Sequence, residues 1–318
     1  MKAPSHLMAA VFLDNRPGHR KQTLGVLDSL AQFTDLQTIE ISVPHLTIPG
    51  EAGKWIKYFL QPGCSTDLSL CDFIIGTGSR THVPMLGCKK KYHIPAITCM
   101  APTPLLRRRF DLCFVPRHDA VPAADNIFYT DGPPNLSRAK GRHDPGQGLI
   151  LIGGRDEKSH SWNDAGIMDS VAFIVQRQHN LRWTISSSPR TPEETDSGLA
   201  KLAAEYDNVH FIRFSDTGPG WIEKEYDKNM TVWVTGDSIS MIYEALSSGC
   251  RVGILPVAWK RQNNKFQRSV DDLSKRGKVV SFAAWKEENA AWILSEPLDE
   301  ARRCAREILK RWWPNRLQ

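Results

Sequence analysis

The stretch TVWVTGDSISMIYEALSSGCRVGIL at residues 231–255 contains an apolar run, a Gly-Asp-Ser turn, an amphipathic segment and a second apolar run. Within the amphipathic segment, one helix face would carry Ile239, Ile242, Tyr243 and Leu246. A strand, a helix and a second strand in this order form a βαβ unit, whose strands are parallel. The stretch therefore predicts an α/β fold with a parallel sheet.

The same alternation of short apolar runs and helical patterns covers the rest of the chain. We expect strands near residues 7–13, 37–43, 72–75, 96–99, 112–115 and 127–129, and again near 149–152, 182–186, 209–214, 231–234 and 252–255. We expect helices near residues 24–31, 163–178, 193–205 and 238–248. Two such series predict two Rossmann-like, doubly wound domains that face each other across a cleft.

A segment rich in proline, glycine and charge separates the two series. We expect a first domain at 1–132, a linker at 133–147, a second domain at 148–298 and a C-terminal basic amphipathic helix at 299–318. A helix of this kind either packs its apolar face on a domain or lies at an anionic membrane surface. Both interpretations stay open, and the second would make the protein a peripheral membrane protein.

Length and composition exclude several classes of protein. The 318 residues are 41% hydrophobic and 24% charged, which excludes a disordered chain and a coiled coil. No apolar run reaches the roughly 20 residues of a membrane-spanning helix, and no signal peptide is recognisable, so we expect a cytoplasmic protein. The net charge of +6 suits anionic partners such as phosphorylated small molecules, acidic lipid or nucleic acid. No nucleic-acid-binding motif is present, so we expect no nucleic-acid partner.

Further motifs are missing from the sequence. The seven cysteines are scattered without metal-ligand spacing, so we expect neither a structural zinc site nor a disulfide framework. Neither GxGxxG nor GxxxxGK[ST] occurs, which argues against a dinucleotide-binding domain and an ordinary ATPase or kinase.

Polar loops follow three strands of the second domain, at the sheet edge where doubly wound folds bind ligands. A glycine turn that starts a helix suits a phosphate, and a guanidinium can donate two parallel hydrogen bonds to the same phosphate. A carboxylate two turns later can accept hydrogen bonds from a ribose. We expect these substrate-binding residues to be Gly153, Gly154, Ser187, Arg190, Thr191, Gly236, Asp237, Ser238, Ser240, Met241 and Glu244. The alternative makes Ser238 a simple helix cap and Glu244 a solvated surface acid.

In the first domain, the strand at 7–13 runs into a loop with an acid, a guanidinium, a glycine and an imidazole, which are Asp14, Arg16, Gly18 and His19. Histidine exchanges protons near physiological pH, so His19 or Asp14 would serve as a general base. Arg16 and Gly18 would contact the substrate. The alternative is that His19 and Asp14 only brace the turn.

Five segments, taken in order, resemble the bacterial relatives of the plant mitochondrial-fission factor named for elongated mitochondria. They are DNRPGHRKQTLG at 14–25, FDLCFVPRHD at 110–119, LIGG at 151–154, SPRTP at 188–192 and VTGDSISMIYEALSSG at 234–249. The resemblance implies the GT-B architecture, with an acceptor domain first and a nucleotide-sugar donor domain second. It also implies that no metal or other cofactor is required and that the acid at Glu244 holds the ribose of the donor.

The resemblance implies a metal-independent glycosyltransferase that uses a nucleotide-sugar donor and a lipid-linked or saccharide acceptor of the cell envelope. Such an enzyme would work at the inner face of the cytoplasmic membrane. Ser238, Ser240 and Arg190 would hold the pyrophosphate. Two alternatives remain open: a nucleotide-sugar epimerase of the same architecture, and a non-catalytic adaptor that keeps the fold as a binding surface.

Overall fold

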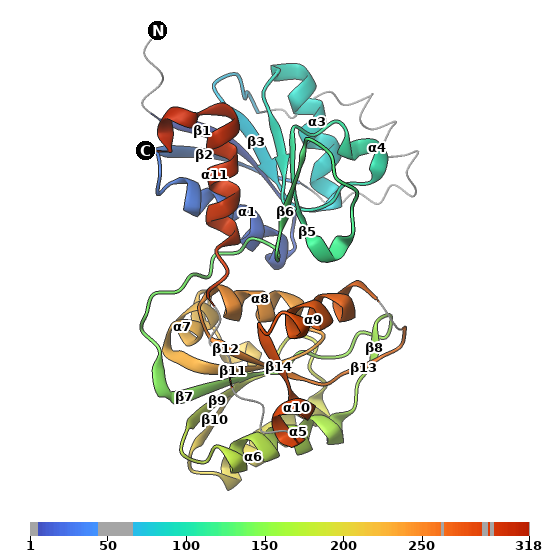
Figure 1. Ribbon diagram of the computed structural model, residues 1–318, viewed down its shortest axis with the longest axis vertical. Coiled ribbons are helices and arrows are strands. Elements are labelled where there is room, and N and C mark those ends of the chain that lie inside the picture. Colours follow the sequence, from blue (N-terminus) through green and yellow to red (C-terminus); the bar gives the residue numbers. More distant parts are fainter. Residues whose placement is uncertain (1–5, 44–65, 262–263, 288–291, 293–295, 318) are drawn as a thin grey trace. The chain divides into compact units, whose positions relative to one another are not determined.

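The computed structural model describes residues 6–43, 66–261, 264–287, 292 and 296–317. The chain divides into two units, one of Met1–Leu136 with Asp299–Gln318 and one of Ser137–Leu298 (Figure 1). Each unit contains a six-stranded sheet, and all the strand pairs in these two sheets are parallel. The prediction of an α/β protein with two Rossmann-like, doubly wound units is therefore confirmed.

The sheet of the first unit has the order β2-β1-β3-β4-β5-β6. Its strands are β1 (Leu7–Leu13), β2 (Leu36–Ser42), β3 (Phe73–Gly76), β4 (Ala96–Thr98), β5 (Leu112–Pro116) and β6 (Ile127–Thr130). Its helices are α1 (Pro17–Leu30), α3 (Ser79–Tyr92), α4 (Pro104–Arg107) and α11 (Glu300–Trp312). The strand order reverses at β1, because β2 pairs on one side and β3 on the other. Such a reversal opens a crevice at the carboxyl ends of β1 and β3.

The sheet of the second unit has the order β10-β9-β7-β11-β12-β14, and it reverses at β7. Its strands are β7 (Asp144–Leu151), β9 (Arg182–Ser186), β10 (Val209–Ile212), β11 (Asn229–Thr235), β12 (Arg251–Leu255) and β14 (Val279–Ser281). Its helices are α5 (Asp164–Arg177), α6 (Glu193–Glu205), α7 (Trp221–Lys228), α8 (Ile239–Ser247), α9 (Lys265–Lys275) and α10 (Phe282–Glu287). A separate antiparallel pair joins β8 (His160–Ser161) to β13 (Ala258–Trp259).

The structure departs from the expected strands in a few places. The strand expected at 209–214 stops at Ile212, because Phe214–Asp216 forms a 3-10 turn. Strand β7 begins at Asp144, so the last residues of the segment expected as a linker belong to the sheet. The strands β8, β13 and β14 were not predicted, since two or three residues are too few to show an alternating pattern.

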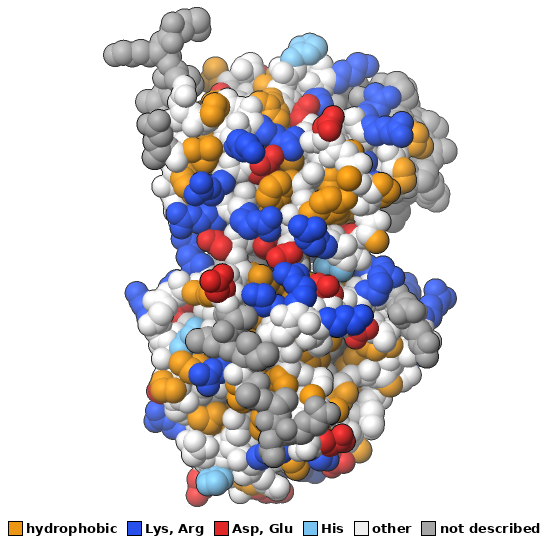
Figure 2. All heavy atoms as spheres, viewed as in Figure 1, with side chains coloured by type: hydrophobic (Ala, Val, Ile, Leu, Met, Phe, Trp, Pro, Cys, Tyr) orange, Lys and Arg blue, Asp and Glu red, His pale blue; other side chains and the backbone are white. Residues whose placement is uncertain are grey.

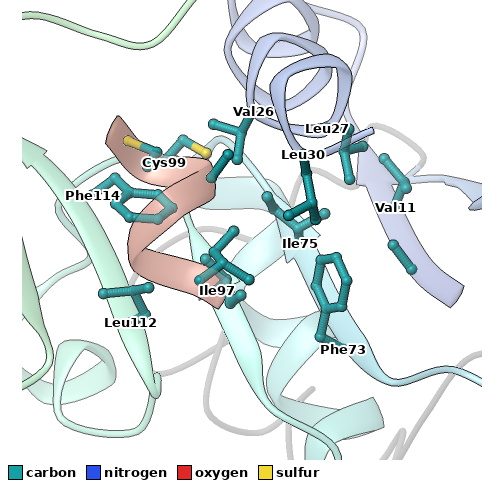
Figure 3. Packing of buried hydrophobic residues seen from close by; sticks show 14 of the residues in the cluster. Val11, Val26, Leu27, Leu30, Phe73, Ile75, Ile97, Cys99, Leu112 and Phe114 are labelled. Atoms are coloured by element: carbon teal, nitrogen blue, oxygen red, sulfur yellow. The ribbon is translucent and has the colours of Figure 1, made fainter. Parts of the chain in front are cut away.

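The helix α11 comes from the far end of the chain but completes the core of the first unit. Cys304, Ala305, Ile308 and Leu309 are buried with residues of α1 and of strands β1, β3, β4 and β5. Figure 3 shows part of this cluster, including Val26 and Phe114. The packing interpretation of this basic helix is therefore correct, and its apolar face is not free to meet a membrane. None of the described helices is both long and apolar enough to cross a bilayer.

Removing the buried side chain of Ile308 should destabilise the first unit. We expect Ile308→Ala to lower the free energy of unfolding by about 2–5 kcal/mol, because the lost apolar contacts leave a cavity. The exposed neighbour Lys310 is the control, and Lys310→Ala should change stability by no more than about 0.5 kcal/mol. Urea unfolding followed by circular dichroism measures both variants. Equal effects of the two substitutions would contradict this account of α11.

Candidate functional site

The reversal of strand order in the second unit brings together the loops that follow β7 and β11. These strands pair directly, with Leu151 opposite Val234. At their carboxyl ends the amide of Gly153 donates a 2.7 Å hydrogen bond to the hydroxyl of Thr235. The loops expected to bind substrate from these two strands therefore lie in contact.

The carboxylate of Asp237 joins three loops of this unit. Its Oδ2 accepts hydrogen bonds from the amide of Gly154 (3.3 Å), from the hydroxyl of Ser238 (3.3 Å) and from Nη2 of Arg190 (2.7 Å). The Asp237 side chain is only 2% exposed, whereas Arg190 is exposed. Its other oxygen, Oδ1, is buried and bonds to no group in the described part of the chain. One buried charge thus ties together the loops after β7, β9 and β11.

Two glycines allow this close packing. A Cβ on Gly153 would lie 2.3 Å from Oδ2 of Asp237 and 2.4 Å from Oγ of Ser238. A Cβ on Gly154 would lie 2.0 Å from the backbone of Arg190. Any larger residue would push the loops apart, so glycine is required at both positions.

In the Ser-rich loop after β9, some polar groups hold the loop in place and others remain available to a ligand. The Thr191 hydroxyl donates to the carbonyl of Gly153 and accepts from the amide of Ser188. The Ser187 hydroxyl accepts a 3.1 Å hydrogen bond from the amide of Phe214. Thr191 and Ser187 therefore brace the loop. Arg190 gives one N–H to the Gly154 carbonyl (3.0 Å) and one to Asp237, so part of its guanidinium fork remains for a ligand.

The start of α8 has no side-chain cap. Ser238 occupies the N-cap position, but neither its hydroxyl nor the Asp237 carboxylate bonds to the amides of the helix. The simple-cap interpretation of Ser238 is therefore wrong, because its hydroxyl bonds to Asp237 instead. The first-turn amides, including those of Ser240 and Met241, stay open to an acceptor from outside the helix. The side chain of Ser240 is exposed, and that of Met241 packs against the core.

Glu244 lies one turn beyond Ser240 and is only 5% exposed. It is close to Tyr226, whose pKa is raised well above its usual value by burial and, to a smaller extent, by the negative charge of Glu244. The Tyr226 hydroxyl donates to the carbonyl of Met241, which fixes α8 against α7. The interpretation of Glu244 as a solvated surface acid is therefore wrong.

The first unit carries an aspartate and histidine pair at the carboxyl end of β1. Nδ1 of His19 lies 2.7 Å from Oδ2 of Asp14, and their side chains are 18% and 1% exposed. The second oxygen of Asp14 accepts a hydrogen bond from the amide of Arg16 (3.1 Å). Asp14 therefore braces the turn and orients His19 at the same time. Nε2 of His19 has no partner among the described residues and is available for a proton.

The loop after β3 supports this pair and was not predicted as part of the site. Gly78 has a φ of 108°, and a Cβ there would lie 2.5 Å from Nδ1 of His19. The preceding residue, Thr77, hydrogen-bonds Thr23 of α1 at 2.7 Å. The two glycines of Gly76-Thr77-Gly78, directly after an expected strand, were the sequence signal that could have indicated a tight loop here.

Other residues of this region have simpler roles. Burial raises the pKa of the Cys99 thiol to about 12, which keeps it protonated and excludes it as a nucleophile. Arg16 is the exposed N-cap residue of α1. A Cβ on Gly18 would meet nothing within 4 Å, so packing does not require glycine there. Across the described ranges, no group of three or more His, Cys, Asp or Glu side chains is placed to hold a metal ion.

His160 is a second residue that sequence reasoning missed. It is buried, and its Nε2 lies 3.1 Å from the carbonyl of Gly154, an acceptor, so Nε2 carries the proton. Its Nδ1 lies 2.8 Å from the hydroxyl of Ser159. His160 thus fixes the Gly153-Gly154 turn from behind. No pattern in the sequence marks it, because it acts through a backbone atom.

Comparisons with known proteins agree with this fold. The family model described as "Mitochondrial fission ELM1" matches residues 17–312. No curated protein matches the chain in sequence. Among solved structures, MnaA from S. aureus with UDP has a TM-score of 0.61 at 14% identity, and the match covers 98% of each chain.

Two further solved structures are similar. UDP-GlcNAc 2-epimerase from Methanocaldococcus jannaschii, in complex with UDP-GlcNAc and UDP, has a TM-score of 0.54 at 12% identity, covering 96% of this chain and 100% of that chain. MurG from Acinetobacter baumannii has a TM-score of 0.56 at 13% identity, covering 96% of this chain and 98% of that chain. At these identities the similarity establishes the shared fold.

The contact between Gly154 and Arg190 can be tested by stability. We expect Gly154→Ala to lower the free energy of unfolding by about 1–3 kcal/mol or more, because the added methyl group overlaps the Arg190 backbone. Gly218 is the control, since a Cβ there would meet nothing within 4 Å. Chemical denaturation of both variants measures the difference. A Gly154→Ala protein as stable as Gly218→Ala would show that the loops do not meet as described.

Proposed function

Because the chain belongs to the mitochondrial fission ELM1 family and has the fold of solved structures that hold UDP or UDP-GlcNAc, we propose that it is a metal-independent glycosyltransferase. It transfers a sugar from a nucleotide-sugar donor to a lipid-linked or saccharide acceptor of the cell envelope, at the inner face of the cytoplasmic membrane. The observation that carries the proposal is the uncapped start of α8 at the strand-order reversal of the second unit.

The pyrophosphate of the donor binds at this helix start. The open amides of the first turn carry partial positive charge, and a phosphate oxygen supplies the acceptor that no side chain provides. The Ser240 hydroxyl and the remaining N–H groups of Arg190 add further donors. These fixed dipoles and the guanidinium stabilise the charge that develops on the leaving nucleotide, the task that a metal performs in other enzymes.

The ribose of the donor binds to Glu244. Residues four apart lie on the same face of a helix, so Glu244 follows Ser240 along α8 at one turn's distance. A carboxylate accepts hydrogen bonds from two adjacent hydroxyl groups, which suits the ribose 2′ and 3′ positions. Burial of Glu244 keeps water from competing for these bonds.

The pair of Asp14 and His19 activates the acceptor. Nε2 of His19 accepts the proton of the attacking hydroxyl, while Asp14 holds the ring at Nδ1 and stabilises the imidazolium that forms. Gly78 fixes the pair because its backbone lies against both side chains. Arg16 and Gly18, at the start of α1, contact the acceptor.

A nucleotide-sugar epimerase is the second candidate, favoured by the similarity to the M. jannaschii epimerase fold. Incubation with a nucleotide sugar and no acceptor separates the two enzymes, since only an epimerase changes the sugar by itself. An adaptor without catalytic activity is the third candidate. In that case a thermal-shift screen of nucleotides and nucleotide sugars would show no stabilisation.

Replacement of Arg190 or Glu244 should weaken nucleotide binding. We expect Arg190→Ala and Glu244→Ala each to lower the affinity for UDP, the first probe to use, by about 10- to 100-fold, as charge-assisted hydrogen bonds contribute about 1.5–3 kcal/mol. The matched control is Arg182→Ala, an exposed arginine at the opposite end of β9. Isothermal titration calorimetry measures all three variants. If Arg190→Ala and Arg182→Ala bind every nucleoside diphosphate tested with the same affinity, the donor site is assigned wrongly.

Replacement of His19 should affect the chemical step and not the donor affinity. We expect His19→Asn to lower kcat by about 10²- to 10⁴-fold, the usual contribution of a general base. His210→Asn, at an exposed histidine of β10, is the control and should leave kcat unchanged. Steady-state kinetics with a saturating donor checks the first effect, and calorimetry with UDP checks the second. An unchanged kcat for His19→Asn would exclude it as the base.

A further inference from the structure

An open groove of about 560 Å³ lies at the amino edge of the first unit's sheet. It is formed where α3 ends, just before β4, and where the chain enters β5. The candidate residues Asp14 and His19 follow the carboxyl end of β1, and the sheet is parallel, so the groove lies at the other edge. It is therefore separate from the proposed acceptor loop.

The groove is lined by five basic side chains and one carboxylate, which are Lys89, Lys90, His93, Arg108, Arg109 and Asp111. The carboxylate is already neutralised, because Asp111 pairs with Lys89 at 2.7 Å. Lys90 and Arg108 are exposed and form no ion pair with any described residue. The groove therefore keeps a positive excess that complements phosphate groups.

Apolar side chains accompany these charges. Leu86, Ile94 and Pro95 form part of the groove wall. Leu105, three residues before Arg108 in the sequence, has a large apolar side chain that is 66% exposed. Figure 2 shows Lys and Arg side chains interspersed with apolar and acidic ones over the drawn face of the first unit. Basic groups beside exposed leucine are typical of surfaces that dock on an anionic bilayer.

We propose that this groove binds the phosphate headgroups of an anionic membrane, with Lys90 and Arg108 as the main contacts and Leu105 inserted at the interface. The buried apolar face of α11 cannot serve this purpose. A phosphate on a soluble molecule offers the same charge, but it gives Leu105 no apolar phase to enter. The inference does not depend on nucleotide binding, since the groove shares no residue with the proposed donor site.

Vesicle binding tests the proposal. The full-length protein is titrated, without nucleotide, into phosphatidylcholine vesicles with and without phosphatidylglycerol, and the bound fraction is measured by sedimentation. Each basic residue near an anionic surface contributes about fivefold in affinity, so Lys90→Gln with Arg108→Gln should weaken binding by about 25-fold. The control double variant, Lys201→Gln with Lys275→Gln, removes the same net charge at two exposed lysines of the second unit. It should bind like the wild type. Thermal melts confirm that both double variants are folded.

Binding that requires phosphatidylglycerol, weakens at high salt and is lost in the groove variant alone would establish the site. Four outcomes would overturn it. The wild type fails to bind the anionic vesicles; both double variants lose binding equally; glycerol phosphate binds in the groove while vesicles do not; or a duplex oligonucleotide binds more tightly than the vesicles. None of these outcomes bears on donor binding, so failure here would count against the membrane location and leave the proposed nucleotide-sugar chemistry untouched.

Discussion

The buried carboxylate of Asp237 is the interaction on which the second unit's site depends. A buried charge is stable only when it is paired and hydrogen-bonded, and Oδ2 of Asp237 receives a guanidinium, an amide and a hydroxyl. Glycine at 153 makes room for it. The loops after β7, β9 and β11 therefore form one connected structure. Without this charge, each would be a separate surface turn.

The same interaction explains why α8 starts without a cap. Asp237 and Ser238 are residue types that commonly cap a helix, but the Asp237 carboxylate bonds to Gly154 and Arg190, and the Ser238 hydroxyl bonds to Asp237. The amides of the first turn are left for a ligand, and a phosphate meets both their hydrogen-bonding need and the helix dipole. Asp14 in the first unit follows a related principle, since one oxygen holds the turn and the other orients His19.

Much of the fold could be predicted because local patterns were strong. Strand β9 and helix α6 match the expected ranges residue for residue, since an apolar run and an amphipathic period each have clear ends. The uncapped helix start could not be predicted, because the tertiary pair with Arg190 overrides the local preference of Asp237 and Ser238. The support from Gly78 and His160 depends on contacts with distant parts of the chain or with backbone atoms, which one sequence does not show.

Amide hydrogen exchange at the start of α8 tests the central claim most directly. The full-length protein is measured by mass spectrometry or NMR with and without a saturating nucleoside diphosphate. The account predicts slower exchange for the amides of Ile239, Ser240 and Met241 when the nucleotide is bound, because its phosphate becomes their acceptor. Exchange that is unchanged at these three amides while the nucleotide demonstrably binds would contradict it.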